Sequence, residues 1–274
     1  MAVTSERSYF LGTHDEELER LGIQHGVWRP TVLECWRRAG IGPGSKVLDI
    51  GAGPGFAAAD LAEIVGPVGR VVAVERSARF VEAGRRMLAG RGHENFEYHE
   101  LDLMTDALPA GGMDATWCRW VACFVSSPAL LLDKLAAVIR PGGVAIFHEY
   151  IHYDTLRIRP GGARLREFVV QVEQGWREAG GEPNIAPAVV SMLQERGFAI
   201  RDAIPRVFCA RPGDELWQWP ATFVDIHLRH QLELGRIEPA WAEAVRAEFA
   251  AAGMQAATLL TTPMVLEIVA EKRH

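Results

Sequence analysis

The stretch VLDIGAGPGF, residues 47–56, decides the fold of this chain. Its first four residues belong to a short apolar run, KVLDI (46–50), and its last residue begins a segment of helical composition, FAAADLAEIV (56–65). Glycines have no Cβ, so the backbone can turn tightly and approach a ligand, and the amides at the start of the following helix point toward that ligand. The stretch therefore predicts a strand, a ligand-binding turn and a helix at the carboxyl edge of a parallel sheet.

The same alternation of strand and helix continues to residue 149. Expected strands cover 70–75, 96–101, 113–118 and 144–149, expected helices cover 77–90 and 127–140, and two more strands are expected at 198–208 and 263–272. A connection between parallel strands is long and usually helical. The alternation therefore predicts an α/β fold with a Rossmann-like, doubly wound, seven-stranded sheet.

Both ends of the chain depart from this alternation of strands and helices. Residues 1–40 are expected to form an N-terminal helical cap, with one or two helices that begin at His14 and Asp15. Residues 41–274 form the main domain, in which 152–190 and 211–260 are expected to be helical lid insertions. The second insertion carries several tryptophans and is too long for a simple hairpin loop.

Composition limits the classes of function. The chain has 29 Lys+Arg and 35 Asp+Glu, a net charge of −6, which argues against a general nucleic-acid binder. Its apolar runs are shorter than the ~18 residues of a membrane span, and the polar start lacks a signal-peptide core. The four cysteines form no CxxC pair, so we expect reduced thiols and no structural metal. These observations predict a cytoplasmic protein.

Acidic residues follow the second and third expected strands. Glu75 can accept two hydrogen bonds from a ribose diol, and Asp102 can accept from the exocyclic amine of adenine. Arg76 could bind a 2′-phosphate, which leaves an NADP site open. However, a dinucleotide fingerprint needs a small residue at position 56, where this chain has Phe56.

With these residues, the segment 46–149 resembles a class I S-adenosylmethionine-dependent methyltransferase. The markers are VLDIGAGPG for the glycine turn, VVAVE for the ribose position, ELDL for the adenine position, and LAAVIRPGGVAIFHE for a helix, turn and fifth strand. The resemblance implies that the final strand is antiparallel and that the N-terminal segment closes over the cofactor, S-adenosylmethionine.

The resemblance also implies two groups of contacts. The cofactor contacts would be Tyr9, Gln24, Gly51, Ala52, Gly53, Glu75, Arg76, Asp102, Leu103 and Arg119. The acceptor contacts would be Trp120, His148, Tyr150, His152, Phe223 and His227, and His148 is also the candidate general base. His227 and His230 share a helix face, which is either solvated or in contact with the ligand.

Residues 148–152 (HEYIH) also match the HExxH pattern of zinc proteases. That chemistry needs a helix, which brings both histidines to one face, whereas the apolar run before the motif predicts a strand. On a strand the two histidines would lie roughly 13 Å apart, at ~3.3 Å per residue. We therefore interpret His148 as an acid/base group or as a histidine that only lines the acceptor pocket.

The leading hypothesis is methyl transfer from S-adenosylmethionine to the oxygen, nitrogen or carbon of a small organic acceptor, with S-adenosylhomocysteine as product. One alternative is an NADP-dependent oxidoreductase, which Arg76 favours and Phe56 opposes. The other is a non-catalytic, S-adenosylmethionine-binding accessory subunit. The inserted helices could also join two copies of the chain in a homodimer.

Overall fold

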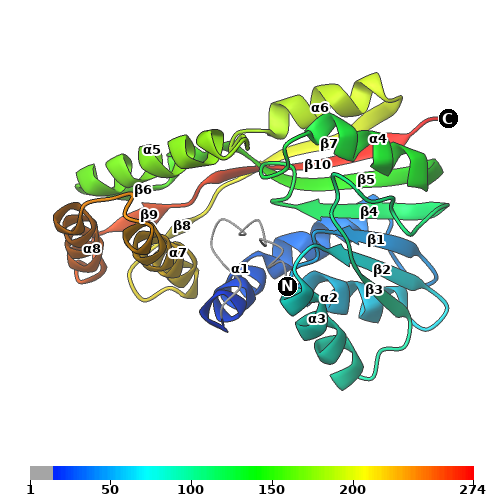
Figure 1. Ribbon diagram of the computed structural model, residues 1–274, viewed down its shortest axis with the longest axis horizontal. Coiled ribbons are helices and arrows are strands. Elements are labelled where there is room, and N and C mark those ends of the chain that lie inside the picture. Colours follow the sequence, from blue (N-terminus) through cyan, green and yellow to red (C-terminus); the bar gives the residue numbers. More distant parts are fainter. Residues whose placement is uncertain (1–14) are drawn as a thin grey trace, which may run out of the picture.

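A computed structural model describes residues 15–274, and its centre is a seven-stranded sheet (Figure 1). The strand order is β3-β2-β1-β4-β5-β10-β7. These strands are β1 (Lys46–Ile50), β2 (Arg70–Glu75), β3 (Phe96–Glu100), β4 (Met113–Arg119), β5 (Ile139–His152), β7 (Phe198–Arg206) and β10 (Met264–Lys272). The first five strands are parallel, and β10 is antiparallel to both of its neighbours. The predicted fold class is therefore confirmed.

Helices cover both faces of this sheet (Figure 1). One face carries α1 (Asp15–Ala39), α2 (Phe56–Val65) and α3 (Ala78–Gly90), and the other carries α4 (Pro128–Val138) and α6 (Ala186–Glu195). The Ser77 side chain accepts a hydrogen bond from the Phe80 amide and so caps the start of α3. The predicted contact at Tyr9 and the predicted cap at His14 lie outside the described residues.

Strands β5 and β10 run beyond the main sheet into a second lobe (Figure 1). This lobe, called the lid below, contains α5 (Ala163–Glu178), α7 (Glu215–Glu233), α8 (Pro239–Gly253) and the turn η1 (Tyr153–Thr155). A small sheet of β6 (Arg157–Arg159), β9 (Leu259–Thr261) and β8 (Cys209–Ala210) ties its segments together. Residues 152–190 and 211–260 are mainly helical and also contribute short strands that the sequence does not predict.

The expected break at Pro141-Gly142-Gly143 is a bulge within β5 instead of a turn before it. Met113 of β4 pairs with Ile139, whereas Ala115 pairs with Val144, so the register shifts between the two pairs. The bulge exposes 140–142. β5 therefore begins earlier than the strand expected at 144–149.

Buried tryptophans pack α1 against the sheet. Trp28 and Trp36 of α1 and Trp117 of β4 are all buried, and the Trp36 and Trp117 rings meet edge to face at 5.2 Å. Buried aromatic side chains contribute much of the apolar stabilisation of a core. This packing holds α1 beside the carboxyl ends of the parallel strands.

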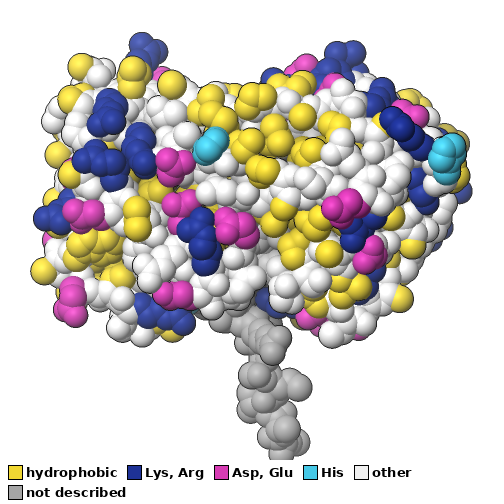
Figure 2. Space-filling model, turned by 90° about the horizontal axis from the view of Figure 1, so that it is seen from above, with side chains coloured by type: hydrophobic (Ala, Val, Ile, Leu, Met, Phe, Trp, Pro, Cys, Tyr) yellow, Lys and Arg dark blue, Asp and Glu magenta, His cyan; other side chains and the backbone are white. Residues whose placement is uncertain are grey.

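One face of the described residues is mixed in charge. Figure 2 shows Lys and Arg side chains interspersed with Asp and Glu on the face that it draws. Within residues 15–274, no helix combines the length and the apolar character that crossing a membrane requires.

Candidate active site

A cavity of about 890 Å³ lies where the carboxyl ends of β1 to β4 meet α1 and the lid. Most of the predicted contact residues line it: Gln24, Gly51, Ala52, Gly53, Glu75, Arg76, Asp102, Leu103, Arg119, Trp120, Tyr150 and Phe223. Small-molecule sites typically occupy ~300–1,000 Å³. The cavity is therefore large enough for a nucleoside cofactor and a second small molecule.

The glycine turn forms one wall of the cavity. Gly51 and Gly53 have φ values of +61° and +58°, a region that favours glycine. A Cβ on Gly51 would lie 2.5 Å from a side-chain carbon of Val121, whereas a Cβ on Gly53 would meet nothing within 4 Å. Gly51 is thus needed for close packing, and Gly53 leaves its backbone open to a ligand.

Glu75 is held in place at the end of β2. Its carboxylate accepts hydrogen bonds from the Gly53 amide at 3.1 Å and from the Ser77 amide at 2.8 Å. Burial raises the pKa of Glu75, against the lowering effect of these amides. Each carboxylate oxygen can accept a further hydrogen bond, as a ribose diol would require.

Asp102 shapes its own loop as well as lining the cavity. Its Oδ1 accepts a hydrogen bond from the Met104 amide at 2.8 Å, and its own amide donates to Asp106 Oδ2 at 2.8 Å. Leu103 and Met104 line the same end of the cavity. A nucleobase would therefore meet one carboxylate and two apolar side chains there.

Two groups of opposite charge lie beside the glycine turn: Asp49 of β1 is buried, and Arg119, at the end of β4, is half-buried. Asp49 Oδ2 and Arg119 Nη1 are buried without a hydrogen-bond partner among the described residues, and both residues line the cavity. Burial raises the pKa of Asp49 to about 8 and lowers that of Arg119 to about 10. An ammonium and a carboxylate on one ligand would satisfy both, because buried polar groups need partners. The sequence-based site assignment does not include Asp49, although a carboxylate inside the apolar run 46–50 is itself an indication of a functional residue.

Aromatic side chains form the opposite end of the cavity. Trp120 stacks between Tyr150 and Trp219, with ring centroids 5.6 Å and 5.8 Å apart. The other aromatic rings that line this end are Phe124, Tyr153, Trp176 and Phe223. Of these, the sequence-based assignment includes only Phe223, because the others come together only when β5 and the lid fold against each other.

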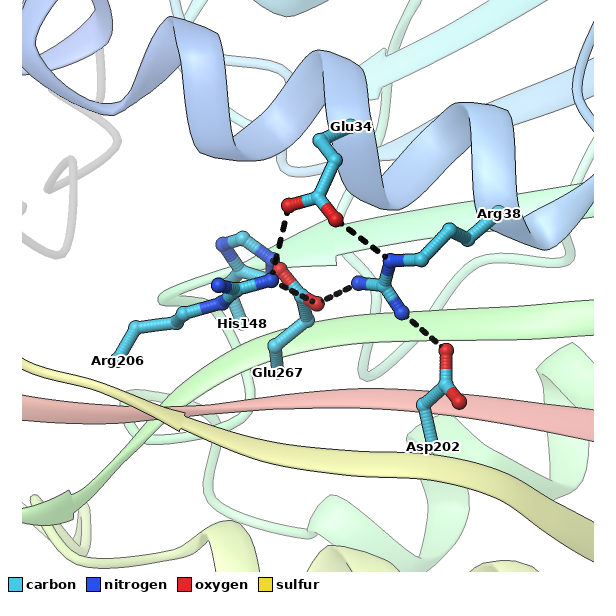
Figure 3. Close-up of polar contacts among 6 residues, drawn as sticks. All are labelled: Glu34, Arg38, His148, Asp202, Arg206 and Glu267. Carbon is cyan, nitrogen blue, oxygen red and sulfur yellow. Dashed lines mark hydrogen bonds and ion pairs between the residues drawn. The ribbon is translucent and has the colours of Figure 1, made fainter.

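His148 does not lie at the cavity, which corrects its predicted roles as base and acceptor contact. It is fully buried beneath Trp28 and Trp117, and its Nε2 lies 3.1 Å from Glu267 Oε2 (Figure 3). Burial lowers the pKa of His148, although the Glu267 contact opposes this shift. The physical reason is that α1 covers this part of β5 and excludes the ligand.

Glu267 of β10 is the centre of an ion-pair network on the α1 side of the sheet (Figure 3). Its Oε1 accepts from Arg38 and Arg206, and both arginines also contact Glu34 of α1. Burial opposes ionisation of Glu267, but the contacts with His148 and Arg206 lower its pKa to about 2. Cys35 brings a possible metal ligand within 4.8 Å of this group. Because two guanidinium groups already neutralise Glu267, we interpret the cluster as an ion-pair network.

The two other predicted histidine contacts also lie away from the cavity lining. The side chain of His152 is 61% exposed and lies 3.7 Å from Asp154. His227 is buried against Phe168 and Phe223, and burial lowers its pKa to about 3. The HExxH pattern lies on β5, so the strand interpretation is correct and its two histidines do not share a helix face.

Comparison with known proteins agrees with this geometry. A family model described as a methyltransferase domain matches residues 48–147. An uncharacterized 37.1 kDa transposon protein of Streptomyces fradiae is 36% identical over 119 residues, which cover 42% of this chain and 33% of that protein. A ubiquinone/menaquinone biosynthesis C-methyltransferase of Hahella chejuensis is 24% identical over 154 residues, which cover 54% of this chain and 62% of that protein. The chain thus spans less than two thirds of either relative.

Among solved structures, a putative methyltransferase from Bacillus halodurans matches with a TM-score of 0.58 and 16% identity. The match covers 88% of this chain and 98% of that one, and at such low identity it shows the fold alone. Residues 48–147 thus match a methyltransferase domain, and the fold around them is the Rossmann-like fold that the sequence predicts. The resemblance seen in residues 46–149 is confirmed.

Proposed function

We propose that the protein transfers the methyl group of S-adenosylmethionine to a small organic acceptor and releases S-adenosylhomocysteine. The observation that carries this proposal is the pair Asp49 and Arg119, which line the same cavity as Glu75, each with a buried polar atom that has no hydrogen-bond partner in residues 15–274. The three side chains offer partners for an ammonium, a carboxylate and a ribose diol. S-adenosylmethionine carries all three groups.

Different residues of this chain would bind different parts of the cofactor. Glu75 would accept from the ribose hydroxyls, Asp102 from the adenine amine, and Arg119 would donate to the amino-acid carboxylate. When bound, S-adenosylmethionine supplies a methyl group on a cationic sulfur. The chain's contribution is to align the acceptor with that methyl group and to exclude water, which can supply much of the catalysis.

The enclosed aromatic end of the cavity supports a small-molecule acceptor. Lid helices α5 and α7 supply Trp176, Trp219 and Phe223 to its walls. Such a space suits a compact ligand better than a polymer, which needs an open groove. The interspersed charges in Figure 2 also differ from the basic surface that phosphate backbones require.

Isothermal titration tests the proposal against both alternatives. We expect the protein to bind S-adenosylmethionine and S-adenosylhomocysteine at micromolar concentrations and to bind NADPH much more weakly. Tight NADPH binding without binding of S-adenosylhomocysteine would overturn the proposal in favour of the oxidoreductase, for which Arg76 at the cavity remains a possible phosphate contact. Binding of S-adenosylhomocysteine without methylation of any acceptor tested would favour the accessory subunit.

A further inference from the structure

The two ends of the cavity differ in charge, and this difference bears on the acceptor. Among the described residues, the carboxylates that line the cavity are Asp49, Glu75 and Asp102, and all three lie at or next to the carboxyl ends of β1 to β3. No carboxylate of residues 15–274 lines the aromatic end. On the proposed function, the acidic end holds the cofactor, so the aromatic end receives the acceptor.

The rings at this end stack on one another, so the outer faces of the stack are nearly parallel. The planes of Trp120 and Tyr150 lie within 16° of each other, those of Trp120 and Trp219 within 21°, and those of Tyr150 and Trp176 within 29°. Nearly parallel faces of this kind favour offset stacking with another flat ring. A planar conjugated molecule therefore fits the walls better than a saturated one.

Trp120 carries two further signs of a binding role. Its φ of +52° makes it the one non-glycine residue with positive φ in residues 15–274, and such backbone strain concentrates at functional sites. Its buried Nε1 has no hydrogen-bond partner among the described residues. An indole N–H is only a donor, so a ligand that satisfies it must present an acceptor atom.

The polar groups around the rings are also donors or cations. Arg20 lines the cavity and donates two hydrogen bonds to Glu17, which does not line it, and one to Gln24, so its further N–H groups are the ones that can donate to a ligand. Arg119 lies 5.1 Å from the Trp120 ring centroid. Burial raises the pKa of Tyr150 and Tyr153, with Arg20 opposing, so both phenols stay protonated at neutral pH and can donate.

From these observations, which rest on the proposed function, we infer that the acceptor is a planar conjugated anion, such as an aromatic carboxylate, an enolate or an acidic phenolate. Stacking against the outer rings of the stack, Trp176 and Trp219, recognises its plane, and the donors of Arg20 and Trp120 recognise its charge. An ammonium acceptor, which aromatic walls alone could also bind, lacks a carboxylate partner here.

An acceptor that arrives ionised also simplifies the transfer step. Its anionic atom supplies the electron pair of the new bond to the methyl carbon. The carbon–sulfur bond breaks, and its electron pair stays on sulfur, which becomes neutral. No proton leaves the acceptor in this step, so the protonated tyrosines at this end are needed only as donors.

The test titrates the full-length protein, saturated with S-adenosylhomocysteine, with three probes of similar size. These are 1-hydroxy-2-naphthoate (planar and anionic), decahydro-2-naphthoate (saturated and anionic) and 2-naphthylmethylammonium (planar and cationic). We expect the planar anion to bind about tenfold more tightly than either of the others, as one additional charge-assisted contact predicts. Equal or tighter binding of the cation or of the saturated anion, or no binding of the planar anion, would overturn the inference.

Two variants locate the site. Trp120→Phe keeps a flat ring but removes the N–H, and the double variant Glu17→Gln/Arg20→Gln removes both charges of the buried pair together, which avoids leaving Glu17 unpaired. Each should reduce the affinity for the planar anion about fivefold or more. Arg164→Gln, at an exposed arginine of α5, is the control and should change nothing. If both variants bind the anion as the wild type does, the inference is wrong.

Binding of S-adenosylhomocysteine is measured first in every protein. If the wild type fails to bind it, the proposed function itself is at fault. If it binds normally and the planar anion is not preferred, only the inference about the acceptor fails.

Discussion

Arg119 Nη2 donates a hydrogen bond to His25 Nδ1 at 3.3 Å, so a helix outside the glycine motif orients the arginine at the cavity. A guanidinium can only donate, so His25 Nδ1 must accept and its Nε2 must carry the proton. That Nε2 in turn donates to Asp60 of α2 at 3.1 Å. Burial lowers the pKa of His25, which keeps the ring neutral, as this arrangement requires.

His25→Phe should therefore weaken cofactor binding without a contact of its own to the ligand. Loss of one hydrogen bond that orients Arg119 should cost about 1 kcal/mol, roughly fivefold in Kd for S-adenosylhomocysteine. Isothermal titration measures it. His25→Asn, which retains an acceptor, should restore part of the affinity, and His99→Phe, away from the cavity, is the control. An unchanged Kd in His25→Phe would show that Arg119 needs no such support.

Cofactor affinity should rise with pH up to about 8 because of Asp49. Its pKa of about 8, raised by burial, means that Asp49 is largely protonated at pH 7 in the free protein. A cationic ligand group beside it favours the ionised carboxylate, so binding should release a proton. Titration of S-adenosylmethionine in buffers with different ionisation enthalpies measures this release. Asp49→Asn should abolish it, and equal release by that variant would exclude Asp49 as the source.

Glu75→Gln should weaken binding of S-adenosylhomocysteine by ~1.5–3 kcal/mol, the range for a hydrogen bond to a charged group. The Gln oxygen can still accept from one of the two amides that hold Glu75, so the fold should survive. Titration gives the loss, and thermal unfolding without ligand checks the fold. A folded variant with an unchanged Kd would remove Glu75 from the cofactor site.

Glu149 should make the ligand-free protein less stable as pH rises. Its Oε1 accepts from the amides of Val121 and Ala122 at 2.9 Å and 2.8 Å, and burial raises its pKa to about 7. The unfolded chain ionises this group near pH ~4.3. The stabilising effect of the neutral form is therefore complete below that pH and is lost as pH rises through about 7.

Denaturant unfolding at several pH values measures this effect. Glu149→Gln keeps an acceptor for the two amides but cannot ionise, so its free energy of unfolding should fall less between pH 5 and pH 8 than that of the wild type. Glu149→Ala should cost ~1–3 kcal/mol at every pH, because buried amides lose their partner. Identical slopes for Glu149→Gln and the wild type would contradict the assignment.

His148→Gln should leave turnover within a few-fold of the wild type. The side chain is buried beneath α1 and bonded to Glu267, and a Gln side chain can still donate to that carboxylate. His148→Phe removes the donor and should lower the free energy of unfolding by ~1–3 kcal/mol. Kinetics across pH distinguish this from a catalytic role: an acidic limb that moves in folded His148→Gln would restore the histidine as a base.

The sequence by itself determined the fold and most of the residues at the acidic end of the cavity. The glycine turn at 51–55 follows β1, and Glu75 and Asp102 end or follow the next two strands. Strand periodicity, turn residues and the carboxyl-edge rule are all local or topological properties, so residue spacing alone brings these groups to one edge.

Tertiary structure alone decided which residues of β5 reach the cavity. His148 and Tyr150 are two residues apart on that strand, yet only Tyr150 lines the cavity, because Trp28 of α1 lies over His148. Tertiary structure alone also decided the contact between His25 and Arg119 and the stacking of rings on Trp120. Each joins segments far apart in the chain, and their packing depends on side-chain shape, which no local pattern in the sequence records.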